Sequence, residues 1–161
     1  MKKLLLSLLL SSAVLFCAAQ TAPRGEAVKI IGIYVGSIAL NAIGDGMNDN
    51  GDKSWGHALN AASIAVLLSS PFIIDYEKDK WYWYLISYTS LRIAFFDYTY
   101  NATRGLPLNY IGGTSTWDKV MKKMNPPNTY MGRGVFLTVG IAVPIKEIAL
   151  PHRRNKQFNT Q

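Results

Sequence analysis

The stretch VKIIGIYVGSIALNAIG, residues 28–44, decides the fold. Its apolar residues continue for several helical turns without a proline, and the segment that follows, 44–51, is rich in Gly, Asp and Asn, which is typical of a turn. Similar apolar segments lie at 53–70, 81–103 and 134–148. The sequence therefore predicts an all-α protein in which four apolar helices form a bundle.

A fifth, shorter helix is expected in the connection 105–132, because Ser115 and Asp118 have the spacing of a helix capping box. Its residues divide into an apolar face with Trp117, Val120, Met121 and Met124 and a basic side with Lys119, Lys122 and Lys123. We expect Pro126 and Pro127 to end this helix. An amphipathic helix of this kind suits adsorption to an anionic bilayer surface or docking over the bundle, and both uses bury the same apolar face.

Residues 1–19 have the layout of a secretory signal peptide. Two lysines precede the apolar run 4–16, and small residues before Gln20 favour cleavage after Ala19. This layout predicts an exported protein of the cell envelope that faces the periplasm.

The rest of the 161-residue chain is expected to form one helical domain over 20–150, followed by a basic flexible tail at 151–161. The single cysteine, Cys17, lies in the expected leader, so the mature chain has no thiol for a disulfide, a thiolate metal site or a nucleophile. The formal net charge of +7 favours an anionic partner. No nucleic-acid recognition signature accompanies this charge, so phospholipid headgroups are the better candidate for an exported chain.

The sequence leaves open whether the helices cross a membrane. The mean hydropathy of +0.08 is moderate, and only the segment 58–74 approaches the roughly 20 apolar residues that a span requires. A membrane would explain the GxxxG spacing of Gly32 and Gly36, which permits close helix contact, and the aromatic cluster at 81–84. We expect a membrane-associated or membrane-embedded protein, with a soluble periplasmic bundle as the alternative. The expected membrane-interface residues are Trp81, Trp83, Trp117, Lys119, Lys122 and Lys123.

Four ionisable residues on three of the predicted helices form a candidate catalytic cluster. Asp45 ends a stripe of polar residues on the first helix, and Asp97 and Arg104 belong to a similar stripe on the third. His57 lies at the start of the second helix. If these residues met, His57 would act as a base and Arg104 would hold a phosphate. Ordinary pairing or solvation of the same side chains is the alternative interpretation.

No metal site is predicted. The segment 46–52 matches an EF-hand loop only in part, because Gly46 stands at the first ligand position and His57 at the last. His57 is also the one histidine of the expected domain 20–150, since His152 lies in the basic tail. A zinc site built mainly from imidazoles would therefore lack ligands. Asp52, Lys53 and His57 resemble the Asp-Lys-x-x-His pattern that opens a helix in VanZ-like membrane proteins, with one more residue before the histidine.

No stretch of the chain reaches the specificity of a catalytic motif, and no cofactor is predicted. The expected function is that of an exported cell-envelope helical protein associated with a membrane, in a structural or interaction role. The alternatives are a small lipid-active phosphate or ester hydrolase and an oligomerising membrane-perturbing protein. The expected partners are anionic lipid headgroups, with a second copy of the chain or an envelope protein as further candidates and no nucleic acid.

Overall fold

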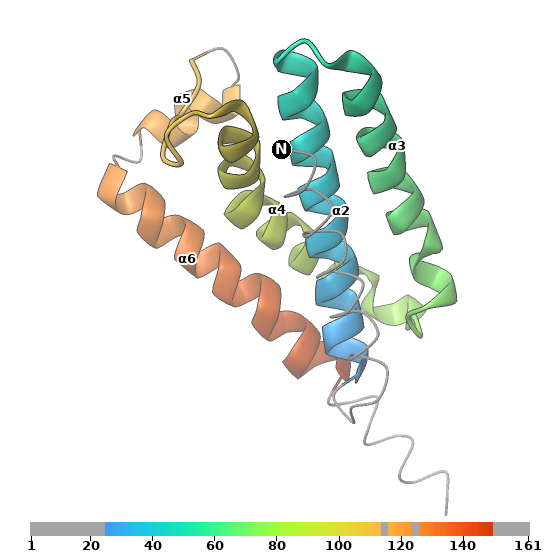
Figure 1. Ribbon diagram of the computed structural model, residues 1–161. Helices are drawn as coiled ribbons and strands as arrows, with labels where there is room; N and C mark the ends of the chain where they lie inside the picture. The colour runs from blue at the N-terminus through green and yellow to red at the C-terminus, as the bar shows by residue number, and fades with distance from the viewer. Residues whose placement is uncertain (1–24, 114–115, 124–125, 150–161) are drawn as a thin grey trace, which may run out of the picture.

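The structure is a computed structural model that describes residues 25–113, 116–123 and 126–149 (Figure 1). These residues form α-helices and shorter helical turns, with no strand among them, which confirms the all-α prediction. The α-helices are α2 (Gly25–Asp49), α3 (Lys53–Ser69), α4 (Trp81–Arg104), α5 (Thr116–Lys123) and α6 (Pro126–Val143). Two 3-10 turns, η1 (Ser70–Phe72) and η2 (Lys78–Lys80), lie between α3 and α4, and the π-helical segment η3 (Pro144–Ala149) continues α6. The predicted leader and the basic tail lie outside the described residues.

Helix α2 is central, since it packs against α3 on one side and α4 on the other, and α6 packs against α4 (Figure 1). The four long helices alternate in direction along the chain. One end of the molecule therefore holds the α2–α3 turn, the end of α4 and α5, and we call it the α5 end. The opposite end holds the start of α2, the α3–α4 connection and η3, and we call it the η2 end.

Two predicted helix boundaries are wrong. Helix α2 continues to Asp49 instead of ending at Gly44, and α6 begins at Pro126 instead of near residue 134. Pro126 and its neighbour were expected only to end the preceding helix, but a proline is also tolerated in the first turn of a helix, where its missing N–H has no partner to lose. Helix α4 ends at Arg104, one residue beyond the expected segment 81–103, and Gly105 caps it with a left-handed φ of 68°.

The glycines that bring helices together are not the predicted GxxxG pair. A Cβ on Gly44 would lie 2.8 Å from the backbone oxygen of Gly56, so α2 and α3 approach each other closely at these two residues. On Gly32 and Gly36 a Cβ would meet no atom of the described residues within 4 Å. The close contact predicted for the GxxxG pair is therefore made instead by Gly44 and Gly56, nearer the α5 end.

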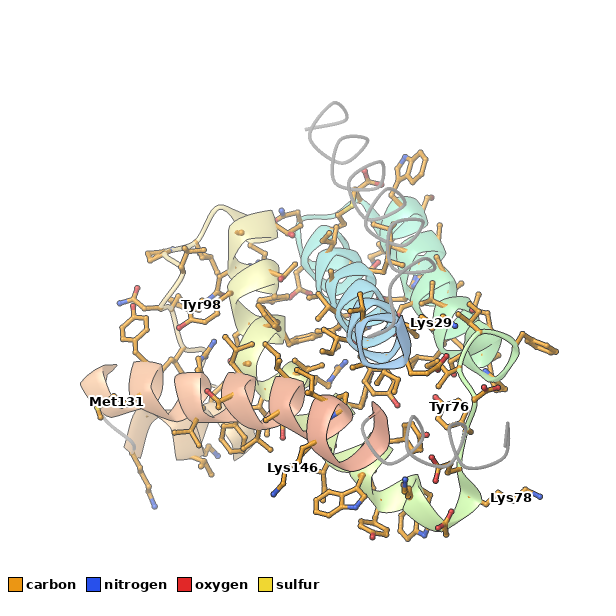
Figure 2. All side chains as sticks on the ribbon, turned by 90° about the horizontal axis from the view of Figure 1, so that it is seen from below. Lys29, Tyr76, Lys78, Tyr98, Met131 and Lys146 are labelled. Atoms are coloured by element: carbon orange, nitrogen blue, oxygen red, sulfur yellow. The ribbon has the colours of Figure 1, made fainter. Side chains whose placement is uncertain are left out.

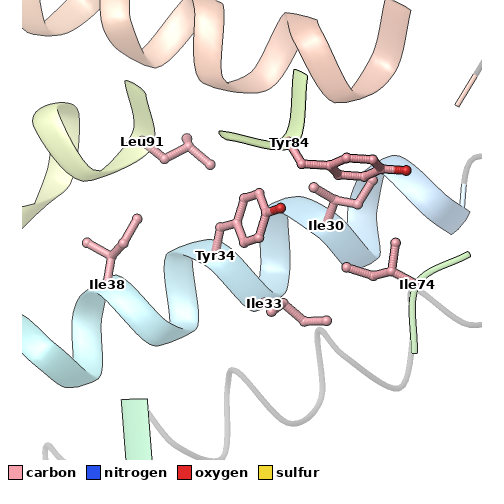
Figure 3. Close-up of a cluster of buried hydrophobic side chains, with 7 residues drawn as sticks. All are labelled: Ile30, Ile33, Tyr34, Ile38, Ile74, Tyr84 and Leu91. Atoms are coloured by element: carbon pink, nitrogen blue, oxygen red, sulfur yellow. The ribbon is translucent and has the colours of Figure 1, made fainter. Parts of the chain in front are cut away.

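Buried apolar side chains hold α2 to α4 (Figure 3). The cluster consists of Ile30, Ile33, Tyr34 and Ile38 of α2, Ile74 of the α3–α4 connection, and Tyr84 and Leu91 of α4. Leu91 also reaches α6, where a Cβ on Gly140 would lie 2.7 Å from the Leu91 Cγ. The Ser87 hydroxyl donates a 2.8 Å hydrogen bond to the Gly140 carbonyl at the same contact. The absence of a side chain at Gly140 thus allows α6 to lie directly on α4.

Among the described helices, α2 alone is long and apolar enough to cross a membrane by length and composition. The sequence had favoured 58–74 instead. That segment is broken because α3 ends at Ser69 and Pro71 lies in the 3-10 turn that follows. Proline cannot supply the N–H that would continue the helical hydrogen bonds.

The glycine contacts predict opposite effects for two alanine substitutions in the same helix. Gly44→Ala should lower the free energy of unfolding by about 1–3 kcal/mol, because the new methyl group meets backbone across the α2–α3 contact. Gly32→Ala should leave stability unchanged or raise it by about 0.5–1 kcal/mol, because alanine favours the helix and its methyl group meets no atom of the described residues within 4 Å. Unfolding followed by far-ultraviolet circular dichroism measures both, and equal effects of the two substitutions would contradict the assigned contact.

Candidate functional site

A cleft of about 620 Å³ opens toward the α5 end of the molecule. Its floor is α4 from Arg92 to Arg104, and Asp49 at the end of α2 lies on one side. The connection from Tyr110 to Gly113 and Asp118 of α5 complete the lining. The cleft therefore follows α4 for about three turns, or roughly 18 Å at 1.5 Å per residue.

Asn101 holds the wall of the cleft in place. Its buried side-chain amide donates hydrogen bonds to the carbonyl oxygens of Leu108, at 3.1 Å, and Tyr110, at 2.9 Å. The backbone carbonyl of Asn101 accepts a hydrogen bond from the backbone N–H of Leu106, after the chain has reversed direction at Gly105. These bonds fold the connection back over the end of α4, and this fold creates the cavity.

Asp97 is part of an ion pair that joins α4 to α6. One guanidinium nitrogen of Arg133 donates to the Asp97 carboxylate at 2.6 Å, and Arg133 is only 4% exposed. The same guanidinium lies over the ring of Tyr98, 4.5 Å from its centroid. Two other nitrogens of Arg133, Nε and Nη1, are buried and have no hydrogen-bond partner among the described residues. The ion pair with Asp97 is therefore the main compensation for a buried positive charge.

A second charged group lines the cleft near the ends of α2 and α4. The Tyr100 hydroxyl donates to the Asp49 carboxylate, and Arg104 donates to the same hydroxyl at 3.0 Å. The Arg104 guanidinium also lies 3.7 Å from Asp49. These contacts link the end of α2 to the end of α4.

A chain of hydrogen bonds runs from the cleft through the centre of the molecule. Arg92 donates to the Asn41 side-chain oxygen at 2.8 Å, and Asn41 donates to the Asn60 side-chain oxygen at 3.0 Å. Asn60 in turn donates to the Asp45 carboxylate at 2.8 Å. The polar side chains of α4, α2 and α3 are thus joined in one network.

The four predicted catalytic residues are only partly brought together. Asp97 and Arg104 line the cleft, but their ion pairs are with Arg133 and with Asp49. Asp45 binds Asn60 between α2 and α3. His57 is exposed near the start of α3 and is not among the residues that line the cleft. A catalytic role for these residues stays a prediction.

The predicted membrane-interface residues lie at the two ends of the molecule. At the η2 end Trp81 is exposed and Trp83 half-buried, and on α5 the three lysines Lys119, Lys122 and Lys123 are exposed. Of the predicted apolar face of α5, Met121 is buried against the body whereas Val120 is 45% exposed. The Trp117 side chain lies outside the described residues, and adsorption of the basic side to a bilayer stays a prediction.

Arg133 and Asn60 are among the residues of these networks that were not singled out as site residues. Arg133 stands alone between glycines in an otherwise apolar stretch, and a lone arginine in such a stretch is a sign of a buried ion pair. Its partner could not be found by helical spacing, because Asp97 lies on another helix. Asn60 lies in the predicted second helix at helical spacing from Gly56 and Ser63, but its bonds to two residues of α2 depend on the α2–α3 contact.

Comparisons with protein-family models, with curated proteins and with solved structures gave no match. The chemistry of the cleft is therefore inferred from its own residues. Those that the structure describes as lining it include arginines, carboxylates and aromatic rings but no Ser, Thr, Cys, His or Lys. This arrangement can bind a charged ligand that also has an apolar part.

Because Asp97 and Arg133 form an ion pair, we expect substitutions of the two residues to have non-additive effects on the free energy of unfolding. Asp97→Asn should lower the free energy of unfolding by about 3 kcal/mol, because it leaves the Arg133 charge buried without its partner. Adding Arg133→Met should recover part of that loss, since the buried charge is then gone. As a control, Glu26→Gln removes an i,i+3 pair with Lys29 near the η2 end and should change stability by less than about 1 kcal/mol. Purely additive losses in a chemical unfolding series would contradict the assigned role.

Proposed function

We propose that this chain is an exported, membrane-embedded helical protein of the cell envelope with a structural or interaction role. One observation carries the proposal: the outer faces of α3 and α6 are largely apolar, whereas several polar side chains and the Asp97–Arg133 ion pair lie between the helices, beside the apolar cluster of α2 and α4. A water-soluble helix has the opposite distribution, with its apolar stripe inside and its charged residues outside. In a lipid environment polar side chains face the interior of the protein, where they can pair.

The outer face of α3 is the clearest case. From residue 58 to residue 72 the chain contains no charged residue. The exposed positions on this stretch of α3 and η1 are Ala58, Ala61, Ile64, Ala65, Leu68, Pro71 and Phe72. The outer face of α6 is similar, because Met131, Val135 and Ile141 are exposed, and Met131 points away from the helices (Figure 2). Contact with hydrocarbon would bury all of this surface.

Polar side chains also lie at the points where the helices touch, beside the apolar cluster of α2 and α4. Ser37 of α2 and Ser63 of α3 exchange hydrogen bonds between their hydroxyls and backbone carbonyls. Ser87 binds the backbone of α6, and Arg133 is buried against Asp97. Small polar residues at helix contacts are typical of helices that associate in membranes.

The ends of the molecule fit the boundaries of a bilayer. At about 1.5 Å per residue the 25-residue α2 and the 24-residue α4 are roughly 36–38 Å long, which exceeds the roughly 30 Å of a hydrocarbon core. The 17-residue α3 is shorter, about 26 Å, and η1 extends it. Exposed Trp81 suits one interface, and the lysines of α5 suit anionic headgroups at the other.

Single cysteines test the proposal directly, because the expected mature chain has no thiol. In a Cys17→Ala background, Ile64→Cys and Val135→Cys replace residues that are 59% and 62% exposed in the middle of α3 and α6. In isolated membranes both should react with maleimide far more slowly than Lys53→Cys, an exposed control at the α5 end, because the reactive thiolate does not form in hydrocarbon. In sodium dodecyl sulfate all three should react alike. Equal rates in membranes would overturn the proposal.

Extraction gives a second, independent test. After an alkaline carbonate wash of the cell envelope the protein should remain in the membrane pellet, because a buried apolar surface is not released by removing charge contacts. Release into the supernatant would exclude an embedded protein. N-terminal sequencing of the recovered chain checks export at the same time, since cleavage of the expected leader leaves Gln20 as the first residue.

A further inference from the structure

Arg92 is the one cation among the described cleft residues that has no ion pair. Arg104, which also lines the cleft, lies 3.7 Å from the Asp49 carboxylate. No carboxylate oxygen of the described residues lies within 4.0 Å of the Arg92 guanidinium nitrogens. Its polar contact is the hydrogen bond to Asn41, and its guanidinium lies 4.4 Å from the centroid of the Phe96 ring.

The acids of the cleft are engaged elsewhere. Asp97 binds the buried Arg133 at 2.6 Å, and Asp49 binds Tyr100 and Arg104. Asp118 lies close to Gly112, and it too has a partner. The positive charge of Arg92 is therefore left over after the other charges of the cleft have been paired.

The guanidinium of Arg92 is also held in one position. The Asn41 oxygen fixes one of its nitrogens, and Asn41 is itself held by Asn60, which is held by Asp45. The Phe96 ring covers one face of its plane. The guanidinium is half-buried and fixed in this way. It can offer two neighbouring N–H donors, an arrangement that matches the oxygen atoms of a carboxylate or phosphate group.

We propose that the cleft binds an anionic ligand whose phosphate or carboxylate group sits on Arg92, with an apolar part of the ligand against Phe96 and Ile111. The ligand is either the headgroup of an anionic phospholipid or a small soluble molecule with the same group. This binding site goes beyond the structural or interaction role proposed above. It also stands independently of membrane embedding, because it depends on contacts within the described residues and is tested on purified protein.

The test uses the purified mature chain in a non-ionic detergent. Its melting temperature is measured in sodium phosphate, glycerol phosphate and sodium acetate, each against sodium chloride of equal ionic strength. A parallel series adds phosphatidylglycerol to the micelles, with phosphatidylcholine as the reference. A bound ligand stabilises the folded protein in proportion to its occupancy, so at least one anion should raise the melting temperature with a saturating dose dependence. A response to the free anions identifies a soluble ligand, and a response to phosphatidylglycerol alone identifies a lipid headgroup. No response in any series overturns the proposal.

Two substitutions locate the response. Arg92→Gln should weaken the apparent affinity by about tenfold or more, since a hydrogen-bonded charge contact is lost. Lys78→Gln removes the same charge from an exposed position at the η2 end (Figure 2) and should keep the full response. An unchanged response in a folded Arg92→Gln protein would overturn the proposal.

A measurement on the unaltered protein covers the case in which Arg92→Gln fails to fold. Phenylglyoxal modifies accessible guanidinium groups, and mass spectrometry of the digested chain reports the modification of Arg92. The anion that raises the melting temperature should slow this modification several-fold relative to chloride. Equal rates of modification in that anion and in chloride would show that Arg92 is not the binding residue.

Discussion

Asn41 is the residue through which three helices meet. Its side-chain oxygen accepts from Arg92 of α4, and its side-chain nitrogen donates to Asn60 of α3. A buried amide that lost these partners would carry a desolvation penalty of about 1–3 kcal/mol. The network therefore sets the relative positions of the three helices more sharply than apolar contacts do, because hydrogen bonds depend on direction and apolar contacts do not.

The close approach of α2 and α3 is a condition for this network. Gly44 and Gly56 leave no side chain between the two backbones, so Asn60 comes within reach of both Asn41 and Asp45. The Ser37–Ser63 contact follows the same pairing of helices nearer the η2 end. Several polar groups are thus paired with one another between α2, α3 and α4, while the outer face of α3 is apolar.

The cleft depends on the same arrangement. Arg92 is directed by Asn41, while Asp97 is drawn into the ion pair with Arg133 on α6. The connection after α4 closes over these groups because Asn101 binds two of its carbonyls. The charges of the cleft are thus distributed by contacts of α4 with α2 and α6, and the Arg92 guanidinium is left without an ion pair among the described residues.

The sequence by itself determined the helical class and most of the helix boundaries. Apolar runs and breaks such as Pro71 and Gly105 act locally, so they can be recognised without knowing what packs where. It also showed Asp97 and Arg104 on one helix face, and both line the cleft. Only the tertiary structure decided which glycines make contacts and which charges pair. Gly32 and Gly44 look alike in the chain, and they differ because α3 lies against one and no described residue against the other. The ion-pair partner of Asp97 could not be identified from the sequence either. Arg133 is distant in sequence, and its position follows from the packing of α6 on α4 at Gly140.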